Sequence, residues 1–98
     1  MAIRTTKWDA ADFLTSDEAI AAYLEAALED GEPKVVAAAL GDIARVKGMS
    51  TIAKDAGVTR EALYKALSEK GDPKLSTLLG VMKALGLRFN VSTAKQAA

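Results

Sequence analysis

Apolar residues recur along most of the chain with the spacing of α-helices. Apolar positions three and four residues apart form one stripe along a helix, and such a stripe normally faces a core. Stripes of this kind predict five helices, which cover about residues 15–30, 33–47, 50–56, 59–67 and 75–85. In the last helix the stripe consists of Leu75, Leu78, Leu79, Met82 and Leu85. We therefore expect an all-α fold.

The pattern changes beyond the last predicted helix. Leu87, Phe89 and Val91 alternate with polar residues, which predicts a short strand over residues 87–92. A lone strand leaves its backbone polar groups without partners. We therefore expect it to pair with the stretch around residues 3–6, with its counterpart in a second copy, or with the sheet of a partner protein.

Small polar residues and glycines mark where the predicted helices begin and cross. Thr15 followed three residues later by Glu18 forms a capping box at the first helix start. Ser50 and Thr59 are expected to cap the third and fourth helices. Gly41 lies inside the second helix, where glycine costs about 1 kcal/mol relative to alanine. A close crossing with another helix would explain it.

The composition limits the class of protein. A chain of 98 residues is expected to form a single domain over residues 1–98. It contains no cysteine and no histidine, which removes disulfides, thiolate metal sites and the commonest general base. No apolar run approaches the ~20 residues that span a membrane, and the first residues have no signal-peptide core. We expect a cytoplasmic protein that is not an enzyme and has no cofactor or metal.

Charge is distributed unevenly, although the net charge is zero. Residues 1–32 carry two positive and eight negative side chains, a net charge of −6, and form an acidic arm and helix. Residues 33–98 carry eleven positive and five negative side chains, a net charge of +6. The basic part could bind phosphates and the acidic part a basic protein, or both could be solvated helix faces.

Residues 33–86 are predicted to hold a helix-turn-helix. This motif needs two short helices that cross steeply at a tight turn. Ala53 is small enough for the crossing, and Gly57 tolerates the positive φ of the turn. Val58 can fill the corner, Leu63 faces the core, and Thr59 can cap the second helix and meet a phosphate. An ordinary helical hairpin is the alternative interpretation.

The outward side of this second helix has the residue types that read a major groove. Arginine suits guanine, glutamate suits cytosine, and tyrosine and lysine suit phosphates or base edges. The side chains expected there are Arg60, Glu61, Tyr64 and Lys65.

From Thr5 to Val91 the chain resembles a known family. The segment IAKDAGVTREALYKALSEKGDPKLSTLLGVMKALGL is similar to lambda-repressor-like helix-turn-helix regulators. With EAIAAYLEAALEDGEP before it, the chain resembles the HigA-like antitoxins of the addiction module antidote family. The resemblance implies a five-helix lambda-repressor-like domain with an added N-terminal helix, a homodimer, operator DNA, a RelE-like ribonuclease toxin as partner and repression of the protein's own operon. Such regulators often contact a phosphate through a glutamine in the first motif helix; here the substitutes are Ser50, Thr51 and Lys54.

The resemblance does not identify the surface that contacts the toxin. Glu25, Glu29 and Asp30 could dock a basic toxin, or they could form a solvated face. Trp8, the single tryptophan, could anchor a partner or cover its own core. Two other functions remain open: a stand-alone phage-type regulator without a toxin, and an interaction module that has lost DNA binding.

Overall fold

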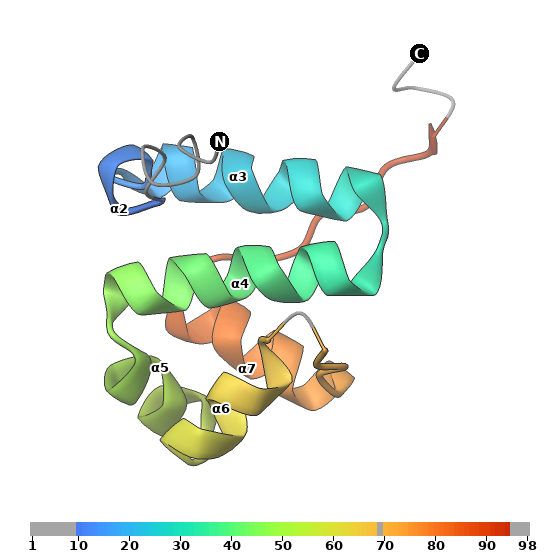
Figure 1. Ribbon diagram of the computed structural model, residues 1–98. Coiled ribbons are helices and arrows are strands. Elements are labelled where there is room, and N and C mark those ends of the chain that lie inside the picture. Colours follow the sequence, from blue (N-terminus) through green and yellow to red (C-terminus); the bar gives the residue numbers. More distant parts are fainter. Residues whose placement is uncertain (1–9, 69, 95–98) are drawn as a thin grey trace, which may run out of the picture.

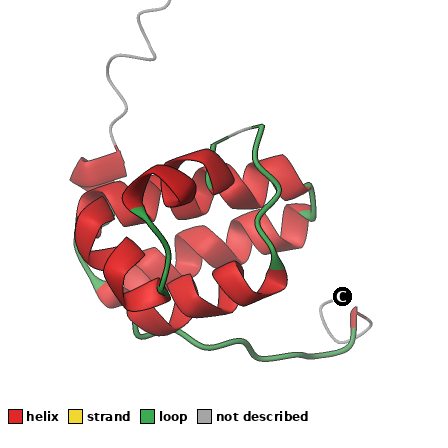
Figure 2. Cartoon of the chain, turned by 90° about the horizontal axis from the view of Figure 1, so that it is seen from below, coloured by secondary structure: helices red, strands yellow, loops and turns green. Residues whose placement is uncertain are grey.

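The computed structural model describes residues 10–68 and 70–94, and these form helices and loops without a strand (Figures 1 and 2). The helices are α2 (Ala10–Phe13), α3 (Asp17–Asp30), α4 (Pro33–Lys47), α5 (Met49–Ala56), α6 (Arg60–Ala66) and α7 (Leu75–Ala84). The long helix α4 lies in the middle, with α3 along one side and the group α5, α6 and α7 on the other (Figure 1). The all-α prediction is confirmed for the described residues, and the single turn α2 was not predicted.

The start of α3 differs from the prediction by one residue. The N-cap is Ser16, whose Oγ accepts a hydrogen bond from the amide of Ala19 at 3.1 Å. The amide of Thr15 instead donates to the carbonyl oxygen of Phe13, which holds Thr15 in the turn after α2. Glu18 is therefore the second helical residue, so the predicted capping box is wrong.

The predicted cap of α5 is also wrong. Helix α5 begins at Met49, so Ser50 lies inside the first turn and is exposed. The connection from α4 is the single residue Gly48, whose φ of 108° only glycine adopts easily. The buried side chain of Met49 directly follows this turn and draws the first helical turn of α5 into the core.

The core is built around α4. Leu40 and Ile43 of α4 are fully buried together with Leu63 of α6 and Val81 of α7. A Cβ atom on Gly41 would lie 2.8 Å from the carbonyl oxygen of Leu67. The close crossing expected at Gly41 is therefore confirmed, and it brings α4 against the end of α6.

The apolar stripe predicted for α7 is only partly correct. Leu75 and Leu79 are 68% and 46% exposed, whereas Met82 is buried as expected and Val81 is buried instead. The helix is rotated because its small residue Gly80 faces α5, where an added Cβ atom would lie 3.3 Å from the Cβ atom of Ala56. Since α7 is apolar on several sides, helical spacing alone could not identify its inner face.

The predicted strand over residues 87–92 is not present in the described part of the chain. The amide of Leu87 donates to the carbonyl oxygen of Met82 and closes the end of α7, and an irregular segment follows (Figure 2). A strand needs a neighbouring strand for its ladder, and the described residues supply none. Trp8 and the proposed pairing stretch at residues 3–6 lie outside the described residues. No helix in the described ranges is long and apolar enough to cross a membrane.

Candidate nucleic-acid interface and acidic helix

Helices α5 and α6 are joined by a tight turn. Helix α5 ends at Gly57, which has a left-handed conformation with φ 78° and ψ 27°. The amide of Val58 then donates to the carbonyl oxygen of Ala53 at 3.0 Å. The amide of Gly57 donates to the carbonyl oxygen of Lys54 at 3.2 Å. The backbone of the turn therefore satisfies its own hydrogen bonds, as a tight corner between two helices requires.

Buried side chains hold the two motif helices together. Ile52 and Ala53 of α5 are buried, and so are Leu63 and Leu67 at the end of α6. All four belong to one continuous core with α4 and α7. The orientation of α6 is therefore fixed by the core of the whole domain.

Thr59 caps α6 as the sequence predicts. Its Oγ1 accepts a hydrogen bond from the amide of Ala62 at 3.0 Å, and its backbone is extended. The side chain is exposed next to the start of α6. A cap of this kind contributes about 1 kcal/mol of stability.

The outward face of α6 carries the four predicted side chains, and all are exposed: Arg60, Glu61, Tyr64 and Lys65. Two of them contact each other. The guanidinium carbon of Arg60 lies 5.3 Å from the centre of the Tyr64 ring, and Nη2 donates to the Tyr64 hydroxyl at 3.4 Å. This is a cation–π contact across one helical turn. The sequence analysis did not predict the pair, although its spacing of four residues was a usable signal.

The predicted backbone contacts on α5 are exposed as well. Ser50, Thr51 and Lys54 all have exposed side chains, with Ser50 and Lys54 one turn apart on the same side of α5. Asp55 on α5 and Glu61 on α6 are exposed among the basic residues. The surface of the two motif helices is therefore mixed in sign, with Lys54, Arg60 and Lys65 against these two carboxylates.

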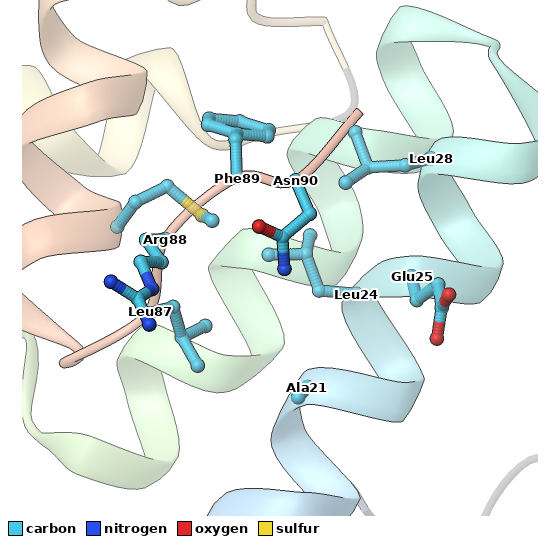
Figure 3. A pocket seen from close by; sticks show the side chains of 9 residues that line it. Ala21, Leu24, Glu25, Leu28, Leu87, Arg88, Phe89 and Asn90 are labelled. Atoms are coloured by element: carbon cyan, nitrogen blue, oxygen red, sulfur yellow. The ribbon is translucent and has the colours of Figure 1, made fainter. Parts of the chain in front are cut away.

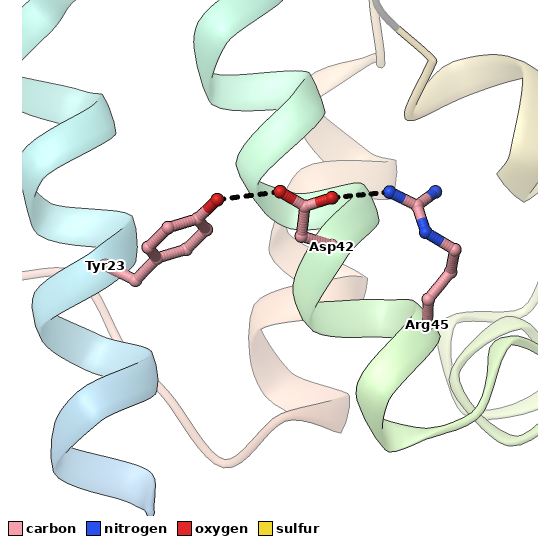
Figure 4. A network of polar contacts seen from close by, with 3 residues as sticks. All are labelled: Tyr23, Asp42 and Arg45. Carbon is pink, nitrogen blue, oxygen red and sulfur yellow. Dashed lines mark hydrogen bonds and ion pairs between the residues drawn. The ribbon is translucent and has the colours of Figure 1, made fainter. Parts of the chain in front are cut away.

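A polar network that the sequence analysis did not predict joins α3 to α4 (Figure 4). The Tyr23 hydroxyl donates to Oδ2 of Asp42 at 2.7 Å, and Nη2 of Arg45 donates to Oδ1 at 2.5 Å. Burial of Tyr23, followed by its hydrogen bond to the Asp42 carboxylate, raises the pKa of the phenol to about 12. The Asp42–Arg45 spacing was visible in the sequence, but the partner on α3 was not.

The three acidic residues expected to bind a toxin do not lie on one patch. Glu25 and Glu29 are one turn apart and share the outer face of α3. Glu25 borders a cavity of about 230 Å³ between α3, α7 and the segment after α7, which Arg88 and Asn90 also line (Figure 3). Asp30 instead borders a groove between α3 and α4. The acidic surface of α3 therefore has two sides.

The acidic helix and the helix-turn-helix are separated in space. Helix α3 packs against α4, and α4 packs against α5 on its other side (Figure 1). The described residues contain no cluster of three Asp or Glu side chains that could hold a metal ion.

The chain is similar to a known protein family and to a bacterial protein. The family described as "Probable addiction module antidote protein" matches residues 4–93. An uncharacterized protein of Haemophilus influenzae is 49% identical over 88 residues, which cover 90% of this chain and 91% of that protein. No solved structure matches the chain.

Proposed function

Because the chain belongs to the family of probable addiction module antidote proteins, we propose that it binds and neutralises a RelE-like toxin and represses its own operon as a DNA-binding homodimer. The family match over residues 4–93 carries the antidote part of this proposal. The corner at Gly57, with α6 fixed by the core and its outer face exposed, supports the DNA-binding part.

In the proposed complex α6 enters the major groove. Arg60 can bond guanine and Glu61 can accept from cytosine, whereas Lys65 contacts phosphate. Polar side chains at the start of α5 and α6 position the protein on the backbone, since phosphate contacts fix register and base contacts supply specificity. These backbone contacts are Ser50, Thr51, Lys54, Thr59 and Tyr64.

A binding titration with the DNA upstream of the protein's own gene tests this face. The Arg60→Ala variant should weaken binding by about 1–3 kcal/mol and relax the preference at one base position. The Lys65→Ala variant should weaken all sequences alike and lower the salt slope by about one. Lys34→Ala, which removes a lysine from the first turn of α4, is the matched control and should bind like the wild type. If Arg60→Ala and Lys65→Ala also bind like the wild type, α6 is not the recognition helix.

The toxin is expected to bind the acidic helix α3. RelE-like toxins hold anionic RNA and present basic surfaces, which the carboxylates of Glu25, Glu29 and Asp30 would complement. Because α4 lies between α3 and the helix-turn-helix, a toxin on α3 would leave α6 free for DNA.

Charge reversals test the toxin face and distinguish its two sides. The pair Glu25→Lys and Glu29→Lys changes the outer face of α3, and Asp30→Lys changes the groove side. Either change should slow association with the toxin and reduce its salt dependence if that side is used, while operator binding is kept. Asp72→Lys, in the exposed loop before α7, controls for net charge. Wild-type association by all variants would exclude α3 as the docking surface.

A neighbouring reading frame for a small basic protein distinguishes the proposal from a stand-alone phage-type regulator. Growth rescue on co-expression with that protein would confirm the antidote activity. Operator binding without such a neighbour would favour the regulator, and absence of operator binding with rescue would favour a pure interaction module.

A further inference from the structure

We propose that the outward face of α7 is the contact between two copies of this chain, and that the two α7 helices pack antiparallel with Leu79 at the two-fold axis. The inference rests on the homodimer of the proposed function and assigns its surface. Its main measurement, the dissociation constant of the dimer, needs neither DNA nor toxin.

The exposed side of α7 is unusually apolar. Leu75 and Leu79 lie one turn apart and are 68% and 46% exposed. Phe89, 38% exposed, lines the same hollow as Leu79 beside the end of the helix. Lys83 is the single charged residue in the ten residues of α7. Contiguous exposed apolar side chains of this kind normally mark a surface that another molecule covers.

The opposite side of α7 already has its partner within the domain. Val81 and Met82 are buried in the core, and a Cβ atom on Gly80 would lie 3.3 Å from the Cβ atom of Ala56 on α5. The helix is therefore apolar on an inner and an outer face. A helix with apolar surface on two sides is normally buried on both, and residues 10–68 and 70–94 leave the outer face of α7 uncovered.

Charge favours a second copy over the basic toxin as this cover. The hollow around Leu79 is lined by two cations, Lys83 and Arg88, and by no carboxylate. A basic protein would be repelled there and would find its complement on the acidic helix α3. A second copy carries the same two cations but no net charge, and the direction of packing can keep its cations apart. A closed two-fold contact uses the same patch on both copies and buries both sets of leucines.

Charge also selects the direction in which the two helices pack. Parallel α7 helices would place the two Lys83 ammonium groups side by side. In an antiparallel pair centred on Leu79, each Lys83 lies four residues, or about 6 Å, from the axis. The two lysines are then about 12 Å apart along the helices, beyond the screening length of ~8 Å at physiological salt. The methylene stem of each Lys83 can cover the partner's Leu75.

Dissociation constants of the full chain, measured by analytical ultracentrifugation over a wide concentration range, test this arrangement. The Leu79→Glu variant should raise the dimer dissociation constant by at least about 100-fold, because two leucines are lost and two carboxylates meet at the axis. Leu75→Glu should change it by less than about 10-fold, because the new carboxylate faces the partner's Lys83. Val35→Glu, at a residue 40% exposed on α4, is the matched control and should leave the constant unchanged.

The three variants also separate failure of this inference from other effects. Circular dichroism tests whether each variant is folded, and Leu79→Ser repeats the test without a charge if Leu79→Glu is unfolded. A wild type that is monomeric throughout, a Leu79→Glu variant that dimerises like the wild type, or a Leu75→Glu variant as weak as Leu79→Glu would each overturn the inference. Methyl resonances of Leu79 that respond to added toxin but not to dilution would overturn it in favour of toxin as the cover. Operator binding and growth rescue are measured separately and report on the proposed function.

Discussion

Replacing Gly41 by alanine should destabilise the domain, although alanine is the better helix former. In an open helix the change from glycine to alanine gains about 1 kcal/mol. At Gly41 the new Cβ atom would lie 2.8 Å from the carbonyl oxygen of Leu67, a backbone atom that cannot rotate away. Overpacking of a buried site costs about 1–3 kcal/mol, so we expect a net loss of about 1 kcal/mol. Because Leu67 ends α6, the proposed binding to operator DNA should weaken as well.

Urea denaturation followed by circular dichroism measures this loss of unfolding free energy. A loss of about 1 kcal/mol should also lower the melting temperature by about 4–8 °C. Ala26→Gly on the exposed face of α3 measures the difference in helix propensity between alanine and glycine and should cost about 1 kcal/mol of stability. Gly80→Ala, whose Cβ would lie 3.2 Å from the Ala56 carbonyl oxygen, should destabilise the domain less than Gly41→Ala because the overlap is smaller. A Gly41→Ala protein that is about 1 kcal/mol more stable than the wild type would refute the close crossing.

Two further predictions concern stability. Thr59→Ala should cost about 1 kcal/mol in urea denaturation, because the amide of Ala62 loses its cap, whereas Thr59→Ser should remain within a few tenths of the wild type. The folded-state pKa of Tyr23, about 12, lies above its ordinary value of 10.0, so the folded state holds this proton more tightly than the unfolded state. The stability that the protonated Tyr23 side chain adds to the folded state is therefore fully present below pH 10 and is lost as pH rises toward 12. In the Tyr23→Phe variant the unfolding free energy should fall less steeply between pH 10 and pH 12. An unchanged slope would show that the hydrogen bond from Tyr23 to Asp42 does not cause this fall.

The sequence predicts those parts of the fold that depend on local chemistry. Gly57 ends α5 and Thr59 caps α6 because only a few residue types suit a left-handed turn or an N-cap. Gly41 indicated a crossing because glycine is otherwise unfavourable inside a helix. The sequence could not decide between Thr15 and Ser16 as the N-cap of α3, since both hydroxyls are suitable and the choice depends on the turn made by the chain before them.

The features that the sequence missed depend on contacts between distant segments. Leu78, Met82 and Leu85 of the predicted α7 stripe do contact the core. Leu79 of the same stripe is exposed, because Gly80 brings a different side of α7 against α5. The hydrogen bond from Tyr23 to Asp42 joins residues nineteen positions apart. Within the candidate site, helical spacing sufficed to place the side chains of α6 on its outer face. The acidic residues of α3 lie on two sides of the helix because α4 packs beside only one of them.

In the proposed function, the position of α4 limits how a toxin could alter repression. Tyr23 ties α3 to α4 through Asp42, and Gly41 of α4 touches the backbone at the end of α6. Helix α4 thus approaches both α3 and the residue that ends α6, the proposed recognition helix. A toxin that leaves α4 in place can change operator affinity only through its own contacts or charge near the DNA. A toxin that shifts α4 would move α6 with it, so the sign of its effect on repression would report which of the two occurs.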